Sequence, residues 1–184
     1  TRYIIYNPGA APLRNNHAAG NAWFVKDIKM VDNADQEMNE TGLIDPLHTA
    51  VIDKRFSAMI KDFKPSADSA SSILLKTYKP NELIYEYKTS VPQLAVFSEV
   101  YYPSGWNATV DGKPVEHFRA NWILRAMIVP EGSHTLVFRF EPSAFYLSQK
   151  AALGGSVLVG LMLIAGIVIA FMKIQKKEAE IAVK

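Results

Sequence analysis

Hydrophobic and polar residues alternate in short runs through the second half of the chain, and turn residues separate the runs. Alternation with a period of two is typical of β-strands that bury one face. Short strands at intervals of roughly ten residues favour an antiparallel sandwich. The pattern therefore predicts a mainly β fold, with a seven-stranded antiparallel sandwich of the immunoglobulin-like or jelly-roll type over residues 73–142. The predicted strands are SILLKTY, LIYEYKT, LAVFSEVYY, WNATV, KPVEHF, WILRAMIV and HTLVFRF.

The run WNATVDGKPVEHF predicts a tight hairpin. Asp111-Gly112 is a strong signal for a type I′ turn, because both central residues of such a turn need φ > 0. With these two residues as the loop, Val110 lies opposite Lys113. The face that we expect in the core comprises Trp106, Ala108, Val110 and Val115. Since a buried Trp stabilises a small sandwich, we expect Trp106 and Trp122 to pack in the core rather than to form a platform for carbohydrate.

The N-terminal third has a different pattern. Its strand-like runs are YIIY, AWFVKDIKMV and TAVID. A polar run, NADQEMNE, can form a short helix with Asp32 or Asn33 as its N-cap. Residues 1–64 are therefore predicted to form a small α+β block packed against the sandwich. The small and polar residues 65–72 predict a linker.

An apolar run near the C-terminus, residues 151–172, has no charged residue in 22 positions. At about 1.5 Å per residue it makes a helix of roughly 33 Å, enough to cross a hydrocarbon core of about 30 Å. Core helices of soluble proteins seldom run this long without a charge, so we predict a transmembrane helix that follows a juxtamembrane segment, 143–150. Ser156 and Gly160 are four positions apart. Small residues at this spacing suit packing against other membrane helices, although they are also common in any membrane helix.

The charges on either side of the apolar run predict its orientation. Lys173, Lys176 and Lys177 follow it directly, whereas only Lys150 precedes it directly. Basic residues favour the cytoplasmic side, so we expect the tail, residues 173–184, to be cytoplasmic and residues 1–150 to lie outside. A tail-anchored protein with the opposite orientation is the rival topology, and the lysine-rich tail argues against it.

Composition narrows the function classes. The net charge of +2 lies entirely in the last twelve residues, because 16 basic and 16 acidic residues precede the apolar run. This balance gives no reason to expect a nucleic-acid partner. Cysteine is absent, which excludes disulfides and thiolate sites. The chain starts with Thr and shows no signal peptide, so we expect a piece of a longer protein or a processed product.

Three stretches resemble the C-terminal end of YfhO-type bacterial membrane proteins. They are GNAWFVKDIKMVDNADQEMN, DPLHTAVIDKRF and YYPSGWNATVDGKPVEHFRANWILRAMIVPEGSHTLVFRFEP. The resemblance implies a large envelope protein with many membrane spans, similar to GT-C glycosyltransferases that use lipid-linked sugars, and a domain outside the membrane. The catalytic carboxylate of such enzymes is expected in an early loop between N-terminal helices. The resemblance therefore assigns no catalytic residue to the present chain.

Candidate chemistry along the chain is sparse. The four histidines, at positions 17, 48, 117 and 134, have no metal-ligand spacing, so we predict no metal site. No nucleotide-binding or nucleophile motif is present, and we predict no cofactor.

One polar group is a candidate for binding. Alternation places Arg119, Asn121 and Arg125 on one face, and two guanidinium groups beside an amide can hold a phosphate or sugar hydroxyls. Cross-strand ion pairing or simple solvent exposure is the competing interpretation. Separately, Asp68-Ser69-Ala70 resembles an O-glycosylation motif of bacterial envelope proteins, which makes Ser69 a candidate modification site.

These observations lead to one main hypothesis. The chain is the non-catalytic extracytoplasmic C-terminal domain and last membrane helix of a YfhO-type protein of the bacterial inner membrane, serving glycosylation of envelope polymers from lipid-linked sugars. Expected partners are membrane lipid, the other membrane helices of the parent protein, and a lipid-linked sugar or envelope glycan. The alternatives are an envelope glycan- or glycolipid-binding module and a protein-docking scaffold, neither with a transferase role.

Overall fold

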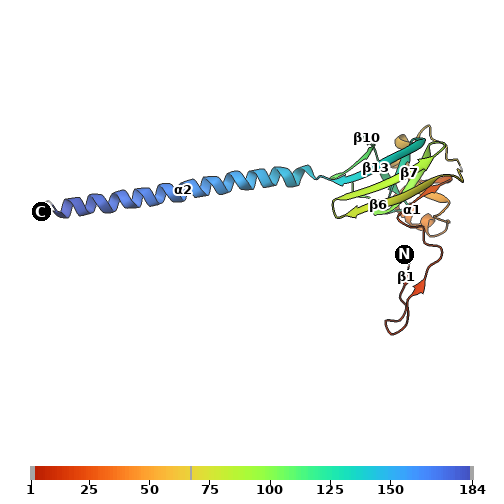
Figure 1. Ribbon diagram of the computed structural model, residues 1–184, viewed down its shortest axis with the longest axis horizontal. Helices are drawn as coiled ribbons and strands as arrows, with labels where there is room; N and C mark the ends of the chain where they lie inside the picture. The colour runs from red at the N-terminus through yellow and green to blue at the C-terminus, as the bar shows by residue number, and fades with distance from the viewer. Residues whose placement is uncertain (1–2, 67, 183–184) are drawn as a thin grey trace. The chain divides into compact units, whose positions relative to one another are not determined.

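The computed structural model describes residues 3–66 and 68–182, with side chains as far as residue 175. The chain forms two compact units, one ending at Glu141 and the other beginning at Pro142. The first unit is rich in strands and the second is a single helix (Figure 1).

The first unit is a β-sandwich, which confirms the predicted fold class. Within the described residues its larger sheet has five strands in the order β10-β9-β13-β7-β6, and its smaller sheet has four in the order β11-β12-β8-β3. All pairings in both sheets are antiparallel. The larger sheet comprises β6 (Ser72–Lys79), β7 (Glu82–Thr89), β9 (Trp106–Val110), β10 (Lys113–Val115) and β13 (Gly132–Phe140). The smaller sheet comprises β3 (Ala22–Val25), β8 (Gln93–Val100), β11 (Phe118–Ala120) and β12 (Leu124–Val129).

The strand count differs from the seven predicted, for two reasons. The run KPVEHF divides into β10 and β11, which belong to opposite sheets. Between β10 and β11 the chain crosses from one sheet to the other, and the ring of His117 lies against β9, with Nε2 3.0 Å from the carbonyl oxygen of Trp106. His117 therefore belongs to neither strand. The second reason is β3, a strand of the predicted N-terminal block, which pairs with β8 along the edge of the smaller sheet.

The predicted hairpin at Asp111-Gly112 is confirmed. Both residues have positive φ, 49° and 79°, as a type I′ turn requires. Val110 pairs with Lys113, and Ala108 pairs with Val115. Ala108 and Val110 are buried, whereas Trp106 and Val115 are partly buried against the same core. The core role of Trp106 is thus confirmed.

The smaller sheet is buried on both faces. One face packs against the larger sheet around a core that includes Tyr85, Phe97 and Phe138. The other face packs against the N-terminal elements around a second core that includes Ile52, Leu94 and Phe118. Five successive residues of β8, Gln93 to Phe97, are therefore buried. Burial of both faces explains why this strand reads as a continuous apolar run rather than as a strict alternation.

The N-terminal elements that cover the smaller sheet form a β-α-β unit. β4 (Asp27–Val31) and β5 (Thr49–Asp53) pair in parallel, and α1 (Ala34–Thr41) connects them. The predicted N-cap is confirmed at Asn33, whose side chain accepts a hydrogen bond from the backbone N–H of Gln36. A 3₁₀ helix, η1 (Lys54–Ile60), follows β5, and a short hairpin of β1 (Tyr3–Ile4) and β2 (Leu13–Arg14) precedes β3.

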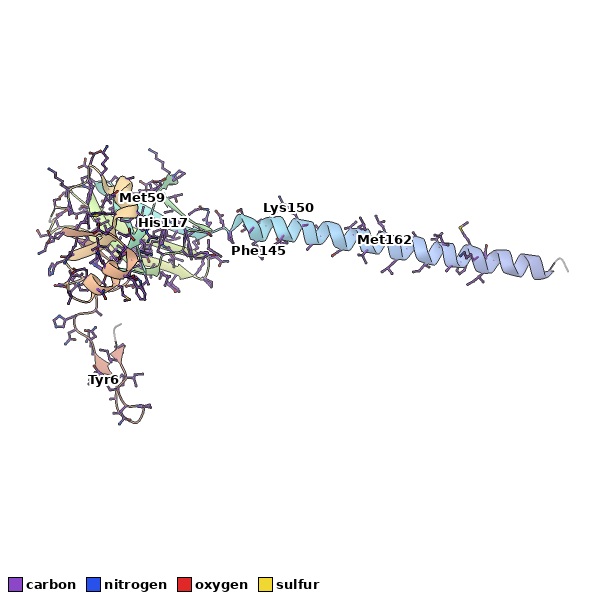
Figure 2. All side chains as sticks on the ribbon, turned by 180° about the vertical axis from the view of Figure 1, so that it is seen from behind. Tyr6, Met59, His117, Phe145, Lys150 and Met162 are labelled. Carbon is purple, nitrogen blue, oxygen red and sulfur yellow. The ribbon has the colours of Figure 1, made fainter. Side chains whose placement is uncertain are left out.

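The second unit is the helix α2, Ser143–Ala182. Its segment Ser143–Gln175 is long and apolar enough to cross a membrane, and the most apolar 18-residue window within it has a mean hydropathy of 2.6. The predicted span, 151–172, lies inside it. Side chains such as Phe145, Lys150 and Met162 project from the helix (Figure 2), and none of the most apolar 18-residue window is buried within the protein. A soluble core helix would be mostly buried, so lipid is the solvent that suits these side chains.

Candidate functional site

The residues predicted to share a polar face, Arg119, Asn121 and Arg125, lie on or beside β11 and β12. Arg119 pairs directly with Arg125 across the two strands, and Asn121 begins the turn that joins them. The structure gives each of the three partners inside the fold. Asn121 and Arg125 are only 4% and 1% exposed. Their role in binding stays a prediction.

Arg119 belongs to a buried ion-pair network. Its Nη2 and Nε donate to Oε2 of Glu37 at 2.5 and 3.1 Å, and Nη2 lies 3.6 Å from Oδ2 of Asp53. Glu37, on α1, is fully buried, and 18% of the Arg119 side chain is exposed. Burial raises the pKa of Asp53, but hydrogen bonds from Arg55 and the charges of Arg55 and Arg119 outweigh it and hold this pKa below its usual value. The network fastens α1 and β5 to the smaller sheet.

Arg125 points into the sandwich core. Its guanidinium carbon lies 4.5 Å from the ring centroid of Trp106 and 4.4 Å from that of Phe138, which is cation–π geometry. Nη2 donates to the carbonyl oxygen of Val100 at 3.2 Å, whereas Nε and Nη1 have no hydrogen-bond partner among the described residues. Burial lowers the pKa of Arg125, and the charge of Glu99 opposes this effect. The two arginines, although paired across the strands, therefore occupy different surroundings.

Asn121 fixes the turn between β11 and β12 to the neighbouring β5. Its side-chain Oδ1 accepts from the backbone N–H of Val51 at 2.8 Å, and its own N–H donates to the Val51 carbonyl at 2.8 Å. Next in the turn, the N–H of Trp122 donates to Oε1 of Glu37 at 3.1 Å. Both turn residues have positive φ, 50° for Asn121 and 68° for Trp122. Asn tolerates this region, but a bulky aromatic residue rarely adopts it.

The prediction that Trp122 packs in the core is wrong. Trp122 is 43% exposed, because the turn extends the chain beyond the end of the β11–β12 ladder. A strict period of two along WILRAMIV assumes that the strand begins at Trp122, whereas β12 begins at Leu124.

A cleft of about 1080 Å³ lies at this turn, and we call it the tryptophan cleft. Residues 121–124 line one side of it, and residues 14–21 together with Trp23 line another. Met38 and Thr41 of α1 also contribute. The indole Nε1 of Trp23 donates to the carbonyl oxygen of Pro46 at 2.7 Å, which holds that ring in place. Two indoles from distant parts of the sequence are thus brought to one concave surface.

The N-terminal side of the tryptophan cleft is tied to the sandwich. The hydroxyl of Ser98 donates to the carbonyl oxygen of Gly20 at 2.7 Å, and its N–H donates to that of Asn21 at 2.8 Å. Among the described lining residues, Arg14 and His17 are the ionisable ones, and none is acidic. Sequence reasoning missed this cleft, because nothing in the local pattern shows that residues 14–23 lie beside residues 121–124.

The histidines outside the tryptophan cleft have local partners. His117 and Met59, both labelled in Figure 2, line a second hollow of about 600 Å³. Burial lowers the pKa of His117, and its Nε2 donates to the carbonyl oxygen of Trp106. His134 and His48 pair with the nearby carboxylates of Asp111 and Asp45. Among the described side chains, which reach residue 175, no three His, Asp or Glu groups gather as a metal site would require.

Ser69 lies in an exposed turn ahead of β6. The preceding Asp68 accepts hydrogen bonds from the N–H and hydroxyl of Ser90 and from the hydroxyl of Thr89. These bonds lower the pKa of Asp68 and anchor the segment to the end of β7. The hydroxyl of Ser69 stays at the surface, where an enzyme can reach it, and its glycosylation stays a prediction.

Comparison with known proteins agrees with the membrane helix. A family model described as bacterial membrane protein YfhO matches residues 55–150, which include most of the sandwich and the start of α2. No curated protein and no solved structure matches the chain significantly. Because the family model covers slightly more than half of the 184 residues, the chain belongs to the YfhO family of bacterial membrane proteins.

Proposed function

We propose that the β-sandwich is a non-catalytic extracytoplasmic domain that serves a glycosyltransferase using lipid-linked sugars, and that α2 is one membrane helix of the same protein. The observation that carries the proposal is a folded β unit followed directly by an apolar helix, in a chain of the YfhO membrane protein family. The task of the domain is to position the sugar acceptor or to cover an active site at the membrane face. The parent protein lies in the bacterial inner membrane, and its other helices and membrane lipid are the partners of α2.

Membrane topology is the first part of this proposal to test. These 184 residues contain no cysteine, and any cysteine in the rest of the parent protein is first replaced by serine, so that only the introduced cysteine is labelled. Ser69→Cys is expected to react with a membrane-impermeant maleimide on bacteria whose outer membrane has been permeabilised, because Ser69 is exposed on the sandwich unit. Lys177→Cys, in the predicted cytoplasmic tail, is expected to react only after the inner membrane is lysed. The reverse pattern would refute the topology.

Sugar transfer is the second part. Bacteria that lack the parent gene are expected to lose one sugar component from an envelope polymer, measured by compositional analysis of purified envelope fractions. The full-length gene should restore that component. An unchanged sugar composition in the deletion strain would reject the transferase role, and the domain would then be assigned to a different process in the membrane.

A second candidate function is a glycan- or glycolipid-binding module independent of transfer. The tryptophan cleft favours it, because Trp23 and Trp122 line a concave surface with amide and hydroxyl side chains. The deletion strain distinguishes the two functions. Loss of a transferase changes the sugar composition of the envelope polymer, whereas loss of a binding module leaves that composition unchanged and reduces the amount of envelope glycan retained at the membrane.

A further inference from the structure

We propose that the tryptophan cleft is a glycan-binding site in which a sugar ring stacks on the indole of Trp122. The inference rests on the proposed role in sugar transfer, since it names a sugar chain as what the domain holds. It assigns a binding site to residues outside the predicted polar face, apart from Asn121. Four observations lead to it.

The first observation is the backbone of Trp122. A left-handed conformation costs a non-glycine residue roughly 1–2 kcal/mol, and with Trp122 43% exposed a large part of this residue contacts solvent instead of the core. Gly or Asn would satisfy the same turn with less strain. An exposed aromatic residue kept in a strained turn at the mouth of a cleft points to a role for the ring itself.

The second observation is that the turn is held from within. Glu37 accepts from the N–H of Trp122, and Asn121 exchanges two hydrogen bonds with Val51 of β5. Glu37 and Val51 are both fully buried. The backbone beneath the indole is therefore fixed before a ligand arrives, which lowers the entropic cost of binding.

The third observation is the second indole. Trp23 lies at the start of β3, and its Nε1 is already satisfied by Pro46. Trp23 therefore offers a ligand its aromatic face rather than its N–H group, and Trp122 adds a second indole to the same cleft. Apolar C–H surfaces of a sugar ring pack against such faces, and the amphipathic Trp side chain suits a ligand that is wet on one side.

The fourth observation is the chemistry of the remaining lining. Asn16, Asn21, Thr41 and Ser98 line the cleft with the two indoles. The hydroxyls of Thr41 and Ser98 already donate to the carbonyl oxygens of Glu37 and Gly20, so they can only accept from a ligand, whereas a side-chain amide such as that of Asn16 can both donate and accept, as sugar hydroxyls require. Arg14 adds a positive charge without an acidic neighbour in the described lining, so the cleft accepts neutral sugars and favours acidic ones. A volume of about 1080 Å³ is at the upper end of ordinary ligand sites, which suits a chain of several sugar rings.

Direct binding tests the inference. The full chain is purified into phosphatidylcholine nanodiscs, which carry no sugar headgroups, and titrated calorimetrically with cellotetraose, chitotetraose, maltotetraose and tetragalacturonic acid. At least one probe is expected to bind, and Trp122→Ala is expected to weaken it about tenfold or more. Trp122→Tyr should retain most of the affinity. Tyr78→Ala is the control, because Tyr78 is 66% exposed on β6 and lies outside the cleft lining.

A second variant separates binding from folding. Trp122→Asn removes the ring but suits a positive φ, so it is expected to lose binding while its thermal unfolding midpoint stays equal to wild type or rises. A lowered midpoint together with lost binding would assign Trp122 a structural role and overturn the inference. Failure of all four probes to bind the wild-type chain would also overturn it. Because this assay needs no transfer reaction, glycan binding and the proposed transferase role can fail independently.

Discussion

Substitution of Glu37 by Gln tests whether the buried network around Arg119 holds the N-terminal elements on the sandwich. Gln has nearly the size of Glu and keeps an oxygen that can accept from the N–H of Trp122. The change therefore removes the negative charge opposite Arg119 and places an NH2 group where Oε2 accepted from the guanidinium, so the two hydrogen bonds from Arg119 are lost with the charge. Glu37 is fully buried, and its Oε2 accepts two hydrogen bonds from the Arg119 guanidinium.

The expected loss follows from the surroundings of the arginine. Removing one partner of a buried ion pair typically costs about 3–5 kcal/mol, because the other charge stays out of water. Arg119 keeps 18% of its side chain exposed and has Asp53 at 3.6 Å, so part of this cost is relieved. We expect Glu37→Gln to lower the free energy of unfolding by about 2–3 kcal/mol. Arg119→Met should cost more, about 4 kcal/mol, since it leaves the fully buried carboxylate of Glu37 without its cation.

Urea unfolding followed by tryptophan fluorescence provides the measurement, because the chain has three Trp residues and all lie in the sandwich unit. Glu40→Gln is the matched control on the same helix, since Glu40 pairs with Lys29 at the surface and such pairs contribute about 0–1 kcal/mol. The double variant Glu37→Gln with Arg119→Met should lose less than the sum of the single losses. Equal losses for Glu37→Gln and Glu40→Gln would refute the reasoning.

Three further predictions concern the hairpin and the core. Gly112→Ala is expected to cost about 1–2 kcal/mol in the same urea experiment, because φ is 79° there, whereas Gly9→Ala should be nearly neutral; equal effects would contradict a role for the turn geometry. Hydrogen bonds to Asp111 and the Glu131 carbonyl raise the pKa of His134, and bonds from the Thr135 N–H and from His134 lower that of Asp111. The ion pair therefore stabilises the fold fully between about pH 4 and 6.5, and this stabilisation is lost as the pH rises through the raised pKa of His134. The difference in unfolding midpoint between wild type and His134→Gln should accordingly shrink above neutral pH. A difference that grows with pH would contradict the assignment. Arg125→Met is expected to leave the unfolding free energy unchanged or higher, because the guanidinium is buried with two nitrogens unpartnered; a loss above about 2 kcal/mol would show that the cation–π contacts outweigh desolvation.

Local chemistry accounts for what could be predicted of the fold. The Asp111-Gly112 hairpin, its register and the N-cap at Asn33 each depend on residues close in sequence, and all three are confirmed. The position of β3 depends instead on pairing with β8, which no local pattern encodes. The division of KPVEHF between two sheets likewise depends on where the sandwich closes around His117.

The candidate site shows the same limit. Alternation grouped Arg119 with Arg125, and the two do pair across β11 and β12. Alternation alone could not show that Arg119 would form an ion pair with the buried carboxylate of Glu37, or that Arg125 would pack against aromatic rings. The exposure of Trp122 was missed because its positive φ belongs to a turn that the hydrophobic pattern reads as strand.

The pairing of β3 with β8 also constrains how the domain can fold as it leaves the ribosome. Ala22 pairs with Phe97, so β3 can pair only after β8 has been synthesised, and β8 also pairs with the later strand β12 on its other side. Contacts so distant in sequence form slowly, because a long loop must close before they stabilise anything. The apolar side chains of β3 therefore stay uncovered while most of the domain is synthesised. During this time the unpaired edge of β3 is the place where misassembly would begin.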